Sequence, residues 1–148
     1  MSHNQRQLVK IDALQNQHDN ILELIEKILN FDIDNEESVY KTLNNIQRLI
    51  KIIKIHNNKE EEFLYNKLLP KLSKDKYKEI SQIYLTKSYL IQELINYKNQ
   101  FGGAEKILNN KKAFMVNSKD VLIDWREHIL AERKNVYSLL EDKDRTED

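Results

Sequence analysis

Apolar residues recur at intervals of three and four along most of this chain, the spacing of an α-helix that buries one face. We expect one helix in each of the stretches that carry this pattern: about 7–30, 35–72, 75–100 and 104–140. The connections between these stretches are short. The pattern therefore predicts an all-α fold, an up-down antiparallel four-helix bundle. We expect a single domain over residues 1–148, with a core at about 8–140 and flexible termini.

The helix ends are indicated by residue type. Asp34 and Glu37 fit a capping box ahead of the second helix, and Pro70 should end or kink that helix. Gly102-Gly103 should stop the third helix. The fourth helical region is expected to break near Asn117-Ser118. These signals place the boundaries to within a few residues.

Composition excludes several classes of protein. Two glycines and one proline in 148 residues are too few for the many turns of an all-β fold. The 24 basic and 24 acidic residues give zero net charge, without the basic excess expected of a nucleic-acid-binding protein. No apolar run approaches the roughly 20 residues of a membrane span, and the N-terminus lacks the apolar core of a secretory signal. We therefore expect a cytoplasmic protein that binds neither nucleic acid nor membranes.

Polar side chains interrupt the apolar faces of three predicted helices. His18 lies in the seam of the first helix. The second and fourth helices each carry an H-x-x-x-E pattern, His56 with Glu60 and His128 with Glu132. Residues four apart lie on the same face of a helix, so each pair directs an imidazole and a carboxylate to one place. Burial of such groups is costly unless a partner compensates.

A bound metal ion is the compensation that we favour. Cysteine is absent, which excludes thiolate ligands and disulfides. Imidazole and carboxylate ligands suit iron, manganese or zinc. Glutamates on two helices can each bridge two ions, which favours a dinuclear centre. A single zinc ion and a metal-free polar core are the alternatives.

In the order of these motifs along the chain, the sequence resembles the hemerythrin-like, or HHE cation-binding, domain family. The resemblance rests on a histidine, an H-x-x-x-E pair, a third helix and a second H-x-x-x-E pair. The surrounding segments agree with it: QHDNILELIEKI, HNNKEEEFLYNKLLPKL and WREHILAERKNVYSLL. It extends over about residues 8–140.

The resemblance implies a non-haem di-iron centre, with two iron ions bridged by an oxo or hydroxo group. An open position on such a centre would accept dioxygen, peroxide or nitric oxide. Glu60 and Glu132 would be the bridging carboxylates. The implied metal ligands are His18, His56, Glu60, His128 and Glu132.

The chain departs from the family on the third helix, which should supply a histidine and has none. The apolar spacing of the first helix, applied to the third, places Ser88 at that position. Tyr84 and Gln92 lie one turn to either side of Ser88 and are the other candidates, and water or a small anion is a further alternative. We predict that the inner face of this helix consists of Tyr77, Ile80, Tyr84, Ser88, Ile91 and Ile95.

The sequence thus predicts an iron-binding protein that binds or senses dioxygen, peroxide, nitric oxide or iron. One alternative is a degenerate, metal-free bundle that acts as an interaction module. Another is a small di-iron enzyme that acts on peroxide or nitric oxide. Whether the protein is an enzyme is left open by these patterns.

Overall fold

The computed structural model describes residues 3–140, apart from the side chains of residues 3, 4 and 7–9. Over these residues the chain forms helices and no strand, which confirms the expected all-α class. None of the described helices is both long and apolar enough to cross a membrane. The elements in order are α1 (His3–Leu29), α2 (Glu36–Glu60), η1 (Glu61–Tyr65), α3 (Asn66–Leu68), η2 (Leu69–Lys71), α4 (Lys74–Gln100), α5 (Ala104–Leu108), α6 (Lys111–Glu132) and η3 (Arg133–Tyr137).

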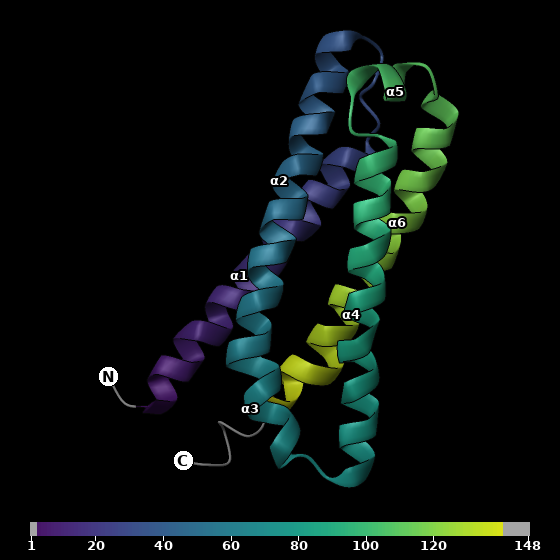
Figure 1. Cartoon of the computed structure of the whole chain (residues 1–148). Helices are drawn as coiled ribbons and strands as arrows, with labels where there is room; N and C mark the ends of the chain where they lie inside the picture. Colours follow the sequence, from purple (N-terminus) through teal and green to yellow (C-terminus); the bar gives the residue numbers. More distant parts are fainter. Residues whose placement is uncertain (1–2, 141–148) are drawn as a thin grey trace.

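Successive long helices run in opposite directions (Figure 1). Helix α1 packs against α2 and α6, and α4 packs against α6. The short helix α5 crosses one end of the assembly between α4 and α6 (Figure 1). Its residue Ile107 is fully buried there, which anchors the connection to the core.

The observed ends of the first three helical regions lie close to the expected ones. Helix α1 starts at His3, before the expected position 7. The cap of α2 is Asn35 rather than Asp34: its side chain accepts from the Ser38 backbone, and Ser38 Oγ accepts from the Asn35 backbone. Pro70 lies in the 3₁₀ turn η2 that ends this region, as expected. The expected flexible tail, 141–148, lies outside the described residues.

The break expected near Asn117-Ser118 is wrong. The chain instead turns at Asn109 and Asn110, between α5 and α6. Ser118 is buried inside α6, where its hydroxyl lies 2.6 Å from that of Tyr97 on α4. A serine hydroxyl that bonds a neighbouring helix does not compete for its own backbone, so α6 continues through this position.

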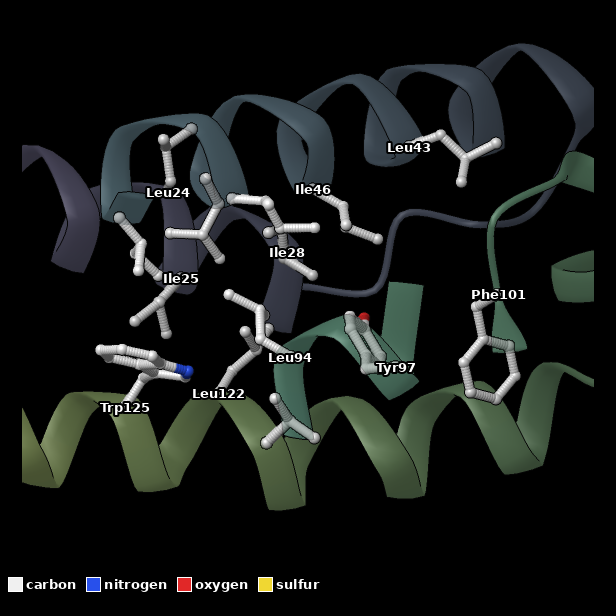
Figure 2. Close-up of a cluster of buried hydrophobic side chains, with 14 of the residues drawn as sticks. Leu24, Ile25, Ile28, Leu43, Ile46, Leu94, Tyr97, Phe101, Leu122 and Trp125 are labelled. Carbon is white, nitrogen blue, oxygen red and sulfur yellow. The ribbon is translucent and has the colours of Figure 1, made fainter. Parts of the chain in front are cut away.

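The apolar core consists of two clusters. The larger joins α1, α2, α4 and α6, and Figure 2 shows part of it, with Trp125 and Leu122 of α6 facing Ile25 of α1. The smaller cluster includes Leu14, Leu64, Ile80 and Val136, among others. On each long helix, the residues between these two clusters include a buried polar side chain. These polar side chains form the candidate site.

Candidate metal centre

Five buried polar residues converge between the two apolar clusters. They are the residues that the sequence analysis singled out: His18, His56, Glu60, His128 and Glu132. Helix α1 supplies the first, the C-terminal end of α2 supplies the next two, and the C-terminal end of α6 supplies the last two. The structure therefore places all five in one buried group.

His18 lies between the two carboxylates. Its Nε2 is 3.2 Å from Oε2 of Glu60 and 3.6 Å from Oε1 of Glu132. Those same oxygens face the other two imidazoles. Oε2 of Glu60 is 2.9 Å from Nε2 of His56, and Oε1 of Glu132 is 3.3 Å from Nε2 of His128. One oxygen of each glutamate is thus directed at histidine nitrogens.

The tautomer of His56 is set by a glutamine. Nδ1 of His56 lies 2.8 Å from Oε1 of Gln17, which can only accept, so Nδ1 carries the proton. In the neutral ring Nε2 then holds a lone pair, and it points at the carboxylate of Glu60. Nε2 of His56 has no hydrogen-bond partner among the described residues, and neither has Nε2 of His128. A lone pair facing a carboxylate oxygen in a buried site is the arrangement that a cation between them would stabilise.

Arg133 lies on the opposite edge of the His18 ring. Its Nε is 3.5 Å from Nδ1 of His18, and its guanidinium also donates to the Gln15 carbonyl at 3.0 Å and to Asp19 at 2.5 Å. A donor at Nδ1 leaves the proton on Nε2, from which His18 donates to Glu60. In this state His18 is a hydrogen-bond donor, so it must release that proton before it can bind a metal.

A lysine that the sequence patterns did not single out lies in the centre. Lys87 of α4 is 5% exposed, and its ammonium contacts Oε1 of Glu60 and lies 3.1 Å from Oε2 of Glu132. It also lies 4.7 Å from the centre of the Tyr65 ring. The third helix thus contributes a cation, where the sequence analysis expected a metal ligand or water.

The expectation that Ser88 occupies this place is wrong. The inner face expected for the third helix is correct in part, because Ile80 is fully buried and Tyr84 and Ile91 pack against the apolar clusters. Ser88 and Gln92 are exposed, and so is Tyr77. Tyr84 is partly buried, but its hydroxyl donates to Glu61 at 2.9 Å, outside the cluster. The buried residues of α4 are Ile80, Lys87, Leu90, Leu94 and Tyr97, and three of them, Ile80, Lys87 and Leu94, are spaced by seven. This sevenfold spacing was the sequence signal for Lys87. The apolar spacing of the first helix, applied to the third, instead indicated the next residue, Ser88.

Two tyrosines that the sequence patterns did not indicate donate hydrogen bonds to the carboxylates. Tyr65 donates to Oε2 of Glu132 at 2.5 Å, and Tyr137 donates to Oε2 of Glu60 at 2.6 Å. Each tyrosine follows the glutamate of its own helix by five residues, in a repeated H-x-x-x-E-x-x-x-x-Y pattern. Each one bonds the glutamate of the other helix.

Both tyrosines end a π-helical turn, Glu61–Tyr65 or Arg133–Tyr137. Five residues make about 1.4 turns of an α-helix, which would direct a tyrosine away from the face of its preceding glutamate. The i→i+5 bonding of a π-turn adds a residue to the turn and brings the tyrosine back to the interior. Such turns occur often at functional sites. The repeated spacing was therefore a usable signal, although the π-turns themselves were not expected.

Ionisation in the cluster follows from burial and close charges. Burial and the charge of Glu60 oppose ionisation of Glu132, but Lys87 and the histidines outweigh them and hold its pKa below the usual 4.5. The pKa of Glu60 also lies well below 4.5: burial opposes ionisation, and Lys87 and two histidines overcome it. Burial also raises the pKa of Tyr65 and of Tyr137, so both remain neutral donors.

The pKa values of the basic side chains are shifted in different directions. Burial lowers the pKa of His18, but its contacts with Glu132 and Glu60 more than offset this and raise it above 6.5. Burial lowers the pKa of His56, and Glu60 offsets only part of that effect. Burial would also lower the pKa of Lys87, but the two carboxylates raise it. His56 is thus the imidazole held neutral for coordination.

The donors fit one metal ion well. Ligand atoms of His18, His56 and Glu60 lie within 4.8 Å of one another, close enough to surround a single ion. Two histidines and one carboxylate with further positions open form a ligand set typical of non-haem ferrous iron. On the other side of His18, His128 and Glu132 supply a further pair of donors. The buried cluster could therefore hold a metal ion.

Comparison with models of protein families finds none that matches this chain, and comparisons with curated proteins and with solved structures find no match either.

Proposed function

We propose that this protein is an iron-binding helical bundle of the hemerythrin type, which uses its buried His/Glu centre in the cytoplasm to bind or sense a small ligand. Bound iron would supply an open coordination position for dioxygen, peroxide or nitric oxide. His18, His56 and Glu60 would hold the ion, and His128 and Glu132 complete the centre. The proposal draws on the order of the motifs in the sequence and on the geometry of the site.

The unpaired Nε2 of His56 carries the argument. This atom is buried, its lone pair is fixed by the Gln17 contact on the other side of the ring, and it faces Oε2 of Glu60 at 2.9 Å. Two electron-rich atoms this close repel each other unless a cation lies between them. Within the described part of the chain no donor reaches Nε2 of His56, and the donors to Oε2 of Glu60 are His18 and Tyr137. A metal ion would pair the remaining nitrogen with the carboxylate.

A metal-free polar core is the second candidate, and one observation favours it. Lys87 lies against both carboxylates and His18 donates to Glu60, so the chain itself can hold Glu60 and Glu132 without an ion. Buried charges that are paired and hydrogen-bonded persist in protein cores. The bundle would then serve as an interaction module.

Metal analysis separates the two candidates. We expect the purified protein, incubated anaerobically with ferrous iron and desalted, to retain iron in proportion to its concentration. His56→Ala should lose that iron, and Lys59→Ala, a change of an exposed residue on the same helix, should not. A wild-type protein that retains neither iron, manganese nor zinc after this treatment would contradict the metal proposal and support the metal-free core. Turnover of peroxide or nitric oxide by the loaded protein would identify an enzyme.

A further inference from the structure

Lys87 of α4 brings a buried positive charge into the centre. It is the one position on α4 that brings a charged side chain into the centre, within the part of the chain that the structure describes. Its ammonium joins Glu60 on α2 to Glu132 on α6. A lysine this deeply buried is rare unless it is paired, and here two carboxylates pair with it.

Glu60 and Glu132 each direct one carboxylate oxygen at imidazole nitrogens and the other at Lys87. Oε2 of Glu60 and Oε1 of Glu132 face imidazole nitrogens. The remaining oxygens, Oε1 of Glu60 and Oε2 of Glu132, both contact Lys87. A carboxylate that bridges two cations divides its oxygens in this manner. In this protein one of the two cations is the ammonium.

We propose that Lys87 is a built-in cation that fills the second position of the centre and restricts the protein to a single metal ion, held by His18, His56 and Glu60. This inference rests on the proposed metal-binding function and specifies the number of ions. The ammonium is attached to the fold, so it neutralises the carboxylates whether or not a metal is bound.

Two features exclude a second ion as long as the lysine is present. The ammonium occupies the carboxylate oxygens that such an ion would need, and like charges repel strongly in a buried site. The donors left on that side are His128 and the imidazole-facing oxygen of Glu132. Helix α4 adds none, because Ser88 and Gln92 face solvent.

The test is the number of ions bound by wild-type protein and by variants of Lys87. Each protein is titrated anaerobically with ferrous iron, desalted and analysed for iron and protein. In parallel each is loaded with Mn(II), whose EPR spectrum distinguishes an isolated ion from a magnetically coupled pair. Lys87→Gln removes the charge, Lys87→His offers an imidazole instead, and Lys87→Arg keeps the charge. Lys78→Gln, at an exposed position of the same helix, is the matched control.

We expect a single ion per chain, with the EPR spectrum of isolated Mn(II), for the wild type, Lys87→Arg and Lys78→Gln. Lys87→Gln and Lys87→His should bind a second ion and show magnetic coupling. A wild-type protein that binds a coupled pair would overturn this inference and leave the proposed metal-binding function intact. Lys87→Gln and Lys87→His variants that fold and still bind one ion would also overturn it. A wild-type protein that binds no metal would instead refute the proposed function. A coupled pair in the wild type would overturn the inference even where a variant is too unstable to purify.

Discussion

Tyr65 and Glu132 lie 67 positions apart in the chain, yet a hydrogen bond of 2.5 Å joins the phenol of one to the carboxylate of the other. The corresponding pair, Tyr137 and Glu60, is joined at 2.6 Å. The second half of the molecule thus repeats the pattern of the first, and each half supplies the donor that holds the other half's carboxylate. These crossed bonds tie the C-terminal end of α2 to that of α6.

Tyr65→Phe should lower the free energy of unfolding of the metal-free protein by about 1.5–3 kcal/mol, because it removes a hydrogen bond to a buried charged group. Denaturation in urea, followed by circular dichroism, measures the change. Tyr77→Phe is the matched control, since Tyr77 is half exposed on α4. Equal stabilities of the Tyr65 and Tyr77 variants would show that the crossed bond contributes nothing.

Gln17→Leu should weaken metal binding about 10–100-fold, the usual effect of removing a partner that orients a ligating histidine. The substitution leaves every proposed ligand in place and removes only the acceptor at Nδ1 of His56. Competition with a chelator of known affinity gives the Kd. Gln82→Leu, at an exposed site on α4, should leave the Kd unchanged. An unaltered Kd for Gln17→Leu would mean that another group orients His56.

His56→Ala should reduce metal affinity more than His128→Ala does. His56 belongs to the group of three ligands that can surround one ion, whereas Glu132 is the only carboxylate of residues 3–140 that His128 contacts. Because a metal that binds only the folded state stabilises it, the rise in Tm on metal addition should be lost in His56→Ala and retained in part in His128→Ala. The opposite order would place the ion on the His128 side of the centre.

Metal affinity should fall as the pH is lowered from 8 to 5. Histidine must be neutral to coordinate, and the carboxylates raise the pKa of His18 above 6.5, so the proton already competes with the metal near neutral pH. Metal retention after equilibration at each pH, measured by elemental analysis, gives the profile. A metal content that stays flat over this range would argue against coordination by His18.

The metal-free protein should lose stability in acid. Both Glu60 and Glu132 have a folded-state pKa below the usual 4.5, so each stabilises the fold above that pH. As the pH drops below 4.5, the unfolded chain takes up protons more readily, and each carboxylate can cost up to about 1.4 kcal/mol per pH unit. Urea denaturation between pH 7 and pH 3 measures the slope. Glu132→Gln should show a shallower slope, and an equal slope would mean that Glu132 is not ionised in the fold.

The sequence by itself determined where the helices lie and at which positions along them polar side chains face the core. Spacing of three and four is a local property, fixed by the helical repeat, so His18, His56, Glu60, His128 and Glu132 could be assigned to buried faces without knowledge of the neighbours. The approximate helix ends followed from local signals as well, such as Pro70.

Only the tertiary structure decided what those residues face. A lysine on a helix ordinarily extends into water, and Lys87 is buried because α2 and α6 each bring a carboxylate to it. Tyr65 and Tyr137 reach the cluster through π-turns, which insert a residue and shift the inner face beyond each glutamate. Both outcomes depend on charges and hydrogen bonds between helices far apart in the chain, and the periodicity of a single helix does not contain that information.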